Sequence, residues 1–288
     1  MSHLILLLVL IAAFLHASWN LLAKRAGNST GFVWLFSTLS ALLYAPAILI
    51  FIIIERPHLN ALQILFIVGT AALHVAYFLF LQRGYAAGDL SLAYPLARGT
   101  APLLSTLGAI VLLKERPSPV ALLGIILLLG GVVFLMGNPL QLIKRGAAVR
   151  TVIGYALLTS LFIATYTVWD KYAVSALLIA PILLDGSSNI ARAVLLTPAI
   201  VGKWGDVRET WRRYRREVIG VALLSPLAYL LVLFAMSVSP VSYVAPLREC
   251  SVLIGTFMGT RFLAEKQVWR RLGAASVILI GIVLLAIS

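Results

Sequence analysis

Three arginines lie inside long apolar stretches of this sequence, where a charge is costly and therefore needs a reason. Arg98 follows AYPLA, Arg192 lies in NIARAVLL, and Arg248 is followed by Glu249 in VAPLRE. A guanidinium can hold a substrate carboxylate or phosphate, and a buried glutamate can carry a proton. These groups predict a polar site inside an apolar molecule, with Glu249 as the candidate for proton coupling. The alternative is that Arg98 or Arg248 pairs with Glu249 only to hold helices together.

Arg192 belongs to a polar stripe, because Asp185 precedes it by seven residues and Asn189 lies between them. At this spacing the three side chains share one face of a helix. Lipid does not tolerate such a face. We therefore expect it to line a cavity, either in contact with a substrate or only hydrating the pathway.

Histidines, tyrosines and two tryptophan pairs interrupt the same stretches; HASWN ends one of them and TVWD ends another. Histidine titrates nearest physiological pH, and convergent polar and aromatic groups are what a small-molecule cavity requires. The candidate substrate-binding residues are His16, Trp19, Asn20, His74, Tyr77, Tyr94, Arg98, Trp169, Asp170, Arg192, Tyr229, Tyr243, Arg248 and Glu249.

Several of these candidates also have a purely structural explanation. A tryptophan at a lipid headgroup boundary can be an anchor rather than a gate. Buried histidines and tyrosines often only pack, and Asp170 next to Lys171 can form an ion pair at a helix end. The single Cys250 excludes an internal disulfide and a multi-thiol metal site, and two interior histidines are too few for a metal. We predict no metal and no cofactor.

The elements that position these residues must be membrane helices. The chain is 61% hydrophobic and 11% charged, with a mean hydropathy of +1.02, whereas soluble domains carry about 25% charged residues. Apolar runs of roughly 20 residues suit membrane spans. Ten such runs are predicted as helices at 3–23, 32–54, 60–82, 89–113, 119–136, 151–173, 177–201, 217–238, 241–263 and 268–287.

Basic residues are distributed unequally between the connections. Sixteen follow the odd-numbered runs and four the even-numbered ones, which places the first group in the cytoplasm and both termini outside. The polar stretch 203–218 is predicted to be a membrane-surface helix. Positive charge at anionic lipid explains the net charge of +13 without nucleic acid as a partner.

The chain also repeats itself at a spacing close to 150 residues. AYPLAR (93–98) is similar to VAPLRE (244–249), LLKER (112–116) to LAEK (263–266), YAPAI (44–48) to LTPAI (196–200), and ASWN (17–20) to TVWD (167–170). We predict two five-helix repeats, 1–143 and 144–288. Since five is odd, the second repeat enters the membrane from the other face, as in many secondary transporters. The predicted fold is all-α, with ten transmembrane helices in two inverted repeats around a central cavity.

In their order and repetition, these motifs resemble the EamA branch of the drug/metabolite transporter superfamily. The resemblance covers essentially the whole chain and implies movement of small metabolites, such as amino acids or amphipathic compounds, through a cavity between the halves and without ATP. We expect a secondary-active or facilitative exporter in the bacterial inner membrane, working by alternating access.

Other features of the prediction follow from the duplication and from the missing motifs. Internal duplication predicts a monomer, and proton coupling is part of the hypothesis. An enzyme is not predicted, because the sequence has no G-x-S-x-G, H-E-x-x-H or nucleotide-binding loop. A flippase for a lipid-linked substrate and a non-transport membrane protein stay open as alternatives.

Overall fold

The structure is a computed structural model that describes residues 3–26, 29–87, 90–136, 147–251, 253–254 and 268–288. These residues form ten helices and no strand. The helices are α1 (His3–Ala26), α2 (Thr30–Glu55), α3 (Ala61–Ala87), α4 (Leu90–Leu112), α5 (Pro119–Met136), α7 (Ala147–Ser175), α8 (Pro181–Ile200), α9 (Trp204–Val238), α10 (Val241–Arg248) and α12 (Val268–Ile287).

Within the described residues, five helices are long and apolar enough to cross a membrane. These stretches are His3–Ala23, Thr30–Glu55, Ala61–Leu81, Arg150–Ser175 and Trp204–Val238. Shorter apolar stretches lie at Thr100–Leu112, Pro119–Gly131 and Gly273–Ile287. The predicted all-α architecture is therefore confirmed, and its helices follow the predicted runs closely.

Two boundaries differ from the prediction. The polar stretch expected as a separate surface helix continues into the next apolar run, and α9 is bent at Tyr214, where φ is −126° and ψ is 25°. Helix α10 ends early, because Glu249 forms a turn in which its N–H bonds to the Pro246 carbonyl at 2.9 Å. Pro246, inside this short helix, removes only the N–H that would bond to the Ser242 carbonyl oxygen. After the turn, residues 250–251 and 253–254 are helical again. Of the run predicted at 241–263, residues 255–263 lie outside the described residues.

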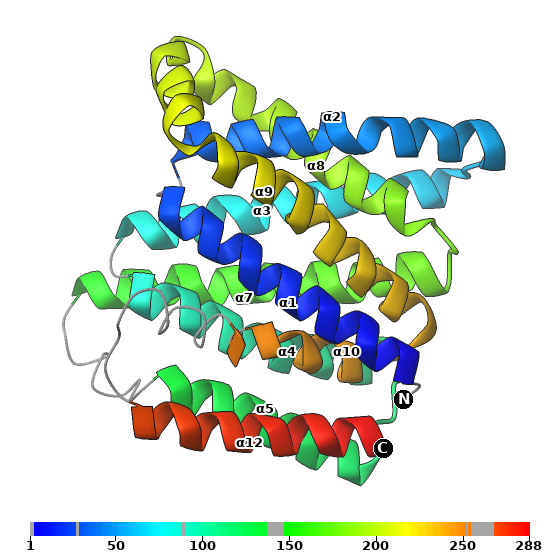
Figure 1. Cartoon of the computed structure of the whole chain (residues 1–288). Coiled ribbons are helices and arrows are strands. Elements are labelled where there is room, and N and C mark those ends of the chain that lie inside the picture. Colours follow the sequence, from blue (N-terminus) through cyan, green and yellow to red (C-terminus); the bar gives the residue numbers. More distant parts are fainter. Residues whose placement is uncertain (1–2, 27–28, 88–89, 137–146, 252, 255–267) are drawn as a thin grey trace.

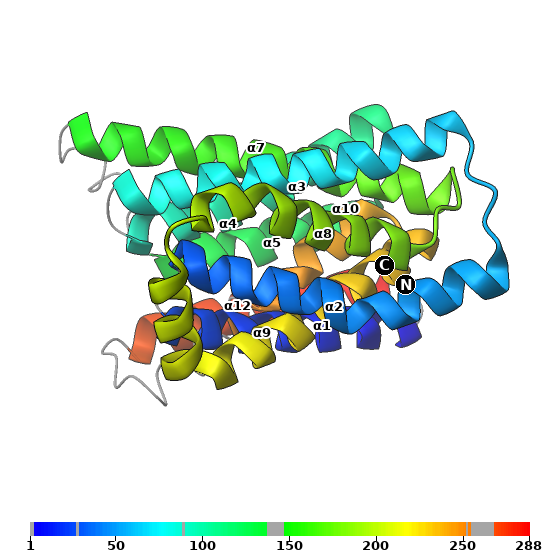
Figure 2. The ribbon, with the colours of Figure 1, turned by 90° about the horizontal axis from the view of Figure 1, so that it is seen from above.

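Successive helices run back and forth along one bundle, and both termini lie at the same end of it in both views (Figures 1 and 2). We call this the terminal end, and the other the opposite end. Helices from the two parts of the chain are interleaved: α1 packs along α9, α3 and α4 along α7, α2 along α8, and α5 along α12. In Figure 1, α1 runs away from the terminal end and α7 runs toward it.

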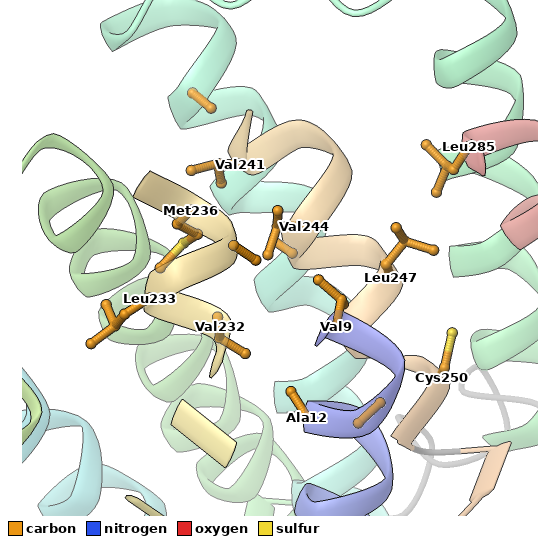
Figure 3. Packing of buried hydrophobic residues seen from close by; sticks show 14 of the residues in the cluster. Val9, Ala12, Val232, Leu233, Met236, Val241, Val244, Leu247, Cys250 and Leu285 are labelled. Carbon is orange, nitrogen blue, oxygen red and sulfur yellow. The ribbon is translucent and has the colours of Figure 1, made fainter. Parts of the chain in front are cut away.

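Apolar side chains from both parts of the chain fill the centre of the bundle (Figure 3). Val9 and Ala12 of α1 belong to the same cluster as Leu233 and Met236 of α9, and all four are fully buried. Cys250 belongs to the same cluster and is only 3% exposed. Since lipid chains are as apolar as these residues, dispersion and close packing hold the helices together here.

Helices α5 and α12 cross in close contact at two glycines. A Cβ atom added at Gly281 would lie 2.7 Å from the Gly124 carbonyl oxygen and 2.7 Å from the Leu128 nitrogen. Both neighbours are backbone atoms, so the helices would have to separate to accommodate a methyl group. Small residues thus set the distance between the last helices of the two parts of the chain.

Gly281→Ala is therefore expected to lower the stability by about 1–3 kcal/mol, as overpacking does, and thermal unfolding in detergent measures it. Gly130→Ala is the matched control on α5, since a Cβ at Gly130 meets nothing within 4 Å. Equal unfolding temperatures for the two variants would contradict the close crossing.

Candidate functional site

The carboxyl group of Asp170 is the centre of a buried polar cluster between α3, α7 and α9. Asp170 is 0% exposed. Its Oδ1 accepts a hydrogen bond of 2.6 Å from the Thr70 hydroxyl, and its Oδ2 accepts one from the Tyr229 hydroxyl. The Nε2 atom of His74 lies 4.0 Å from the same Oδ2. Helices from both parts of the chain thus hold one carboxyl group.

The imidazole of His74 is oriented by its surroundings. Its Nδ1 lies 2.9 Å from the Thr70 carbonyl oxygen, which can only accept, so Nδ1 carries the proton. The ring stacks on Tyr166 with centroids 4.1 Å apart and meets Tyr229 edge-on at 5.2 Å. The other nitrogen, Nε2, is thereby directed toward Asp170. A carboxyl and an imidazole in this arrangement can exchange a proton through small movements.

Three tyrosine rings pack together beside this pair. The ring centroid of Tyr166 lies 5.7 Å from that of Tyr77 and 6.1 Å from that of Tyr229, and both pairs are edge-on. Tyr77 and Tyr229 were both predicted from the sequence. Tyr166 and Thr70 were not, although each is four residues before a predicted site residue and so lies on the same helix face.

The polar stripe of α8 is a hydrogen-bonded set of side chains. Arg192 donates from an Nη atom to Asn189 Oδ1 at 3.0 Å, and Asn189 donates to Asp185 Oδ2 at 3.1 Å. The guanidinium lies 5.7 Å from the Phe36 ring centroid. Its Nε is buried and makes no hydrogen bond within the described part of the chain. Within the described residues, one donor of this guanidinium is therefore left for a further partner.

Helix α8, which carries the stripe, packs along α3, which carries Thr70 and His74. The Ser187 hydroxyl of α8 donates to the Ile67 carbonyl oxygen of α3 at 3.5 Å. One region therefore contains a guanidinium from α8, a carboxyl from α7 and an imidazole from α3, with aromatic rings between them. Such a set can bind a small polar molecule.

The pair Arg248 and Glu249 is buried at the end of α10. Arg248 is 5% and Glu249 1% exposed, and Arg248 Nε lies 4.0 Å from Glu249 Oε1. The charges of Arg248 and Glu249 are thus in contact, but as neighbours in one segment they do not join two helices as the sequence-based prediction supposed. The side chains of Arg98 and Tyr94 lie outside the described residues.

The predicted residues of α1 contact one another. Asn20 donates to the His16 carbonyl oxygen at 2.7 Å, and the rings of His16 and Trp19 meet edge-on at 4.8 Å. Trp19 packs on the buried cluster that includes Ala23 and Phe32. The amide of Asn20 is therefore satisfied within its own helix.

Trp169 is packed against α3. Its ring stacks on Phe66 with centroids 4.0 Å apart, and its Nε1 donates to the Phe66 carbonyl oxygen at 3.0 Å. Gly69 makes room for it, because a Cβ there would lie 2.5 Å from the ring. These contacts hold the part of α7 that carries Asp170 against α3.

The ion pair suggested between Asp170 and Lys171 is wrong. Neighbouring residues of a helix point about 100° apart, and the Lys171 ammonium instead donates to the carbonyl oxygens of Met236 at 2.6 Å and Ser239 at 3.0 Å. It therefore binds the carbonyl groups at the end of α9, where a positive charge is favourable.

A pocket of about 290 Å³ lies at the terminal end, between the α4–α5 connection and the α9–α10 turn. It is lined by Glu115, Arg116, Pro117, Ser239, Pro240, Ser242, Tyr243 and Ser288. Tyr243, a predicted site residue, therefore lines this pocket. The Glu115 carboxylate accepts the N–H groups of Val241 at 2.7 Å and Ser242 at 2.9 Å. It caps α10 from the other part of the chain.

Glu115→Ala is expected to lower the stability by about 1–3 kcal/mol, because two N–H groups lose a charged acceptor, and chemical denaturation measures the change. Glu55, which is exposed at the end of α2, provides the control variant Glu55→Ala. If both substitutions had the same small effect, Glu115 would not hold the two parts together.

The apolar helices, with ionisable and aromatic side chains enclosed among them, define a multi-pass integral membrane protein with an internal polar site. The family model of the EamA-like transporter family matches the chain twice, over residues 3–137 and 150–287. The chain belongs to this family, which is part of the drug/metabolite transporter superfamily, and contains two of its repeats. The resemblance seen in the sequence is thereby confirmed, and members of the family are transporters.

One similar solved structure, titled "Crystal structure of protein", is 15% identical in sequence. The match covers 99% of this chain and 96% of that chain, with a TM-score of 0.78. It shows a shared fold. No curated protein matches the chain.

Proposed function

We propose that this protein is a secondary-active or facilitative transporter that moves small metabolites, such as amino acids, by alternating access. The observation that carries the proposal is the buried cluster of Asp170, Thr70, His74 and Tyr229, supplied by helices from both parts of the chain. A site shared in this way can open to one face and then to the other as the parts move.

The proposed topology is ten spans in two inverted five-helix repeats around a central cavity. The opposite directions of α1 and α7 in Figure 1 and the common end of both termini support it. Exposed Arg25, Arg83 and Arg150 lie in α1, α3 and α7 near the opposite end. This charge favours placing the opposite end in the cytoplasm, and we propose a bacterial inner membrane, a monomer and export.

The proposed substrate carries a carboxylate and an ammonium group. Arg192 offers a buried guanidinium donor, Asp170 offers a carboxyl group, and the rings of two tyrosines lie against the Asp170–His74 pair. A guanidinium binds a carboxylate strongly, while a carboxyl group and aromatic faces bind an ammonium. An amino acid presents both charges in one small molecule.

Proton coupling is proposed to use Asp170 and His74. The two groups are 4.0 Å apart, and the rings of Tyr166 and Tyr229 pack against the imidazole of His74. Glu249 stays a second candidate, since it is buried beside Arg248. During transport the contact of Glu115 with α10 would have to break when the terminal end opens.

Uptake of radiolabelled amino acids into proteoliposomes tests the proposal, with a pH gradient imposed or absent. A thermal-shift screen against metabolites selects the solutes, because a ligand that binds the folded state raises its stability. Saturable uptake above that of empty vesicles is expected. Lipid translocation without uptake of any solute would overturn the proposal and favour a flippase.

A further inference from the structure

The first part of α9, Trp204–Arg216, lies across the opposite end of the bundle. In Figure 2 it runs across the direction of the long helices, and the bend at Tyr214 turns the chain back along the bundle. If the long helices cross a bilayer, this segment lies close to the plane of its surface. A helix in that position meets lipid headgroups rather than acyl chains.

One face of the segment is attached to α2. Val207 is 6% exposed and packs against Gly31 of α2. A Cβ atom added at Gly31 would lie 3.6 Å from a methyl carbon of Val207. The ring of Trp204 meets Trp34 edge-on at 5.6 Å, and Trp34 donates from Nε1 to the Thr197 hydroxyl at 3.0 Å. The segment is thus held against the ends of α2 and α8.

The other face is exposed and strongly basic. The segment has five exposed arginines against two exposed acidic residues, Asp206 and Glu209; the arginines are Arg208, Arg212, Arg213, Arg215 and Arg216. Four of these five arginines lie within RRYRR at 212–216, a stretch with no acidic residue. Trp204 and Trp211 are 57% and 39% exposed on the same segment.

This combination matches the headgroup layer of an anionic bilayer. One guanidinium group can donate two hydrogen bonds to the same phosphate group. Tryptophan prefers the boundary between acyl chains and water. A soluble partner would not account for both exposed tryptophans and a placement across the end of a membrane bundle. Positive charge at a lipid surface contributes roughly 1 kcal/mol per arginine or lysine when the lipid is anionic.

We propose that Trp204–Arg216 is a binding surface for anionic lipid headgroups of the phosphatidylglycerol type. The arginines bind the phosphodiester groups, and the two tryptophans lie in the headgroup layer. Because Val207 and Trp204 attach the segment to α2, and α9 continues along α1, bound lipid holds three helix ends in place. Anionic lipid should therefore stabilise the folded protein.

Thermal unfolding of the purified full-length chain tests the proposal in neutral detergent mixed with either phosphatidylglycerol or phosphatidylcholine. Phosphatidylglycerol is expected to raise the unfolding temperature by several degrees, and phosphatidylcholine to leave it unchanged. In the variant with Arg212, Arg213, Arg215 and Arg216 all replaced by Gln, most of this shift should be lost. A full shift in that variant, or an equal shift with phosphatidylcholine, would overturn the proposal.

Arg56 and Arg116, which are exposed at the terminal end, provide the control. With both replaced by Gln, the phosphatidylglycerol shift should be retained. Inorganic phosphate alone should give no shift, and a shift equal to that of the lipid would overturn the proposal by showing a site for free anions.

A measurement on the unaltered protein covers the case in which the four-residue variant does not fold. Raising the salt from about 0.1 M to about 1 M shortens the screening length from about 10 Å to about 3 Å. The phosphatidylglycerol shift should then fall by at least half. A shift independent of salt would contradict binding through the arginines.

Discussion

Asp170→Asn is expected to reduce uptake driven by a pH gradient by at least about tenfold while leaving the protein folded. The amide has the same shape as the carboxyl group; its oxygen can still accept from one of the two hydroxyls that hold Asp170, those of Thr70 and Tyr229, and its NH2 group can donate to the oxygen of the other. It cannot gain or lose a proton at neutral pH. A tenfold fall corresponds to about 1.4 kcal/mol. The rate of radiolabelled uptake in proteoliposomes, with and without the gradient, measures the effect.

Two comparison variants make this result specific. Glu249→Gln tests the second buried carboxyl group, and gradient-driven uptake unchanged in one variant removes that residue from coupling. Asp206→Asn alters an exposed carboxyl group in the first turn of α9 and should leave uptake unchanged. Exchange of labelled for unlabelled solute needs no net proton movement, so it separates the two roles proposed for Asp170. Unchanged exchange in Asp170→Asn would assign Asp170 to proton transfer alone, and loss of exchange as well would show that its carboxylate also binds the substrate ammonium.

Arg192→Ala is expected to weaken substrate binding about 10- to 100-fold. Hydrogen bonds to charged groups contribute about 1.5–3 kcal/mol, and every 1.4 kcal/mol is a factor of ten in affinity. The guanidinium is the donor proposed for the substrate carboxylate, since its Nε is buried without a hydrogen bond within the described residues. The dependence of thermal stability on substrate concentration measures the dissociation constant in detergent, apart from any transport step.

Arg192→Lys separates charge from geometry at this position. A lysine keeps the positive charge but loses the planar fork that binds a carboxylate in two places, so an intermediate affinity is expected. Arg150→Gln is the control, because Arg150 is exposed near the start of α7. Unaltered affinity in Arg192→Ala, together with a lower unfolding temperature, would assign Arg192 a structural role instead.

Features encoded along a single helix were the ones predictable from the sequence. The contacts of Arg192 and Asp185 with Asn189 follow directly from a spacing of three and four residues. The apolar runs likewise predicted where the helices lie, because a membrane span requires a minimum length of apolar chain.

Contacts between helices were harder to predict. Thr70 is an ordinary residue in an apolar run, and only the packing of α3 on α7 shows that it donates to Asp170. The same holds for Glu115, whose partners Val241 and Ser242 are more than 120 residues away in the sequence. Neither periodicity nor composition specifies which faces of two helices meet. A prediction of the pairs would need the crossing geometry of the bundle.

The Asp170 and Lys171 prediction failed for a related reason. Adjacent opposite charges in a sequence suggest a pair, but a helix directs them to different neighbours, here the hydroxyls of Thr70 and Tyr229 and the carbonyl groups at the end of α9. The composition of the surface segment of α9 was enough to predict a helix at the membrane surface. Its attachment to α2 through Val207 was visible only in the structure.

The burial of Cys250, the only cysteine of the chain, has a practical consequence. Maleimide reagents react with a thiolate that meets water, and this thiol is enclosed by the apolar cluster around α1, α9 and α10. A new cysteine placed at an exposed position on either face can therefore be labelled selectively while the native thiol stays in place. Paired fluorophores on the two faces would then report each opening of the protein as it occurs.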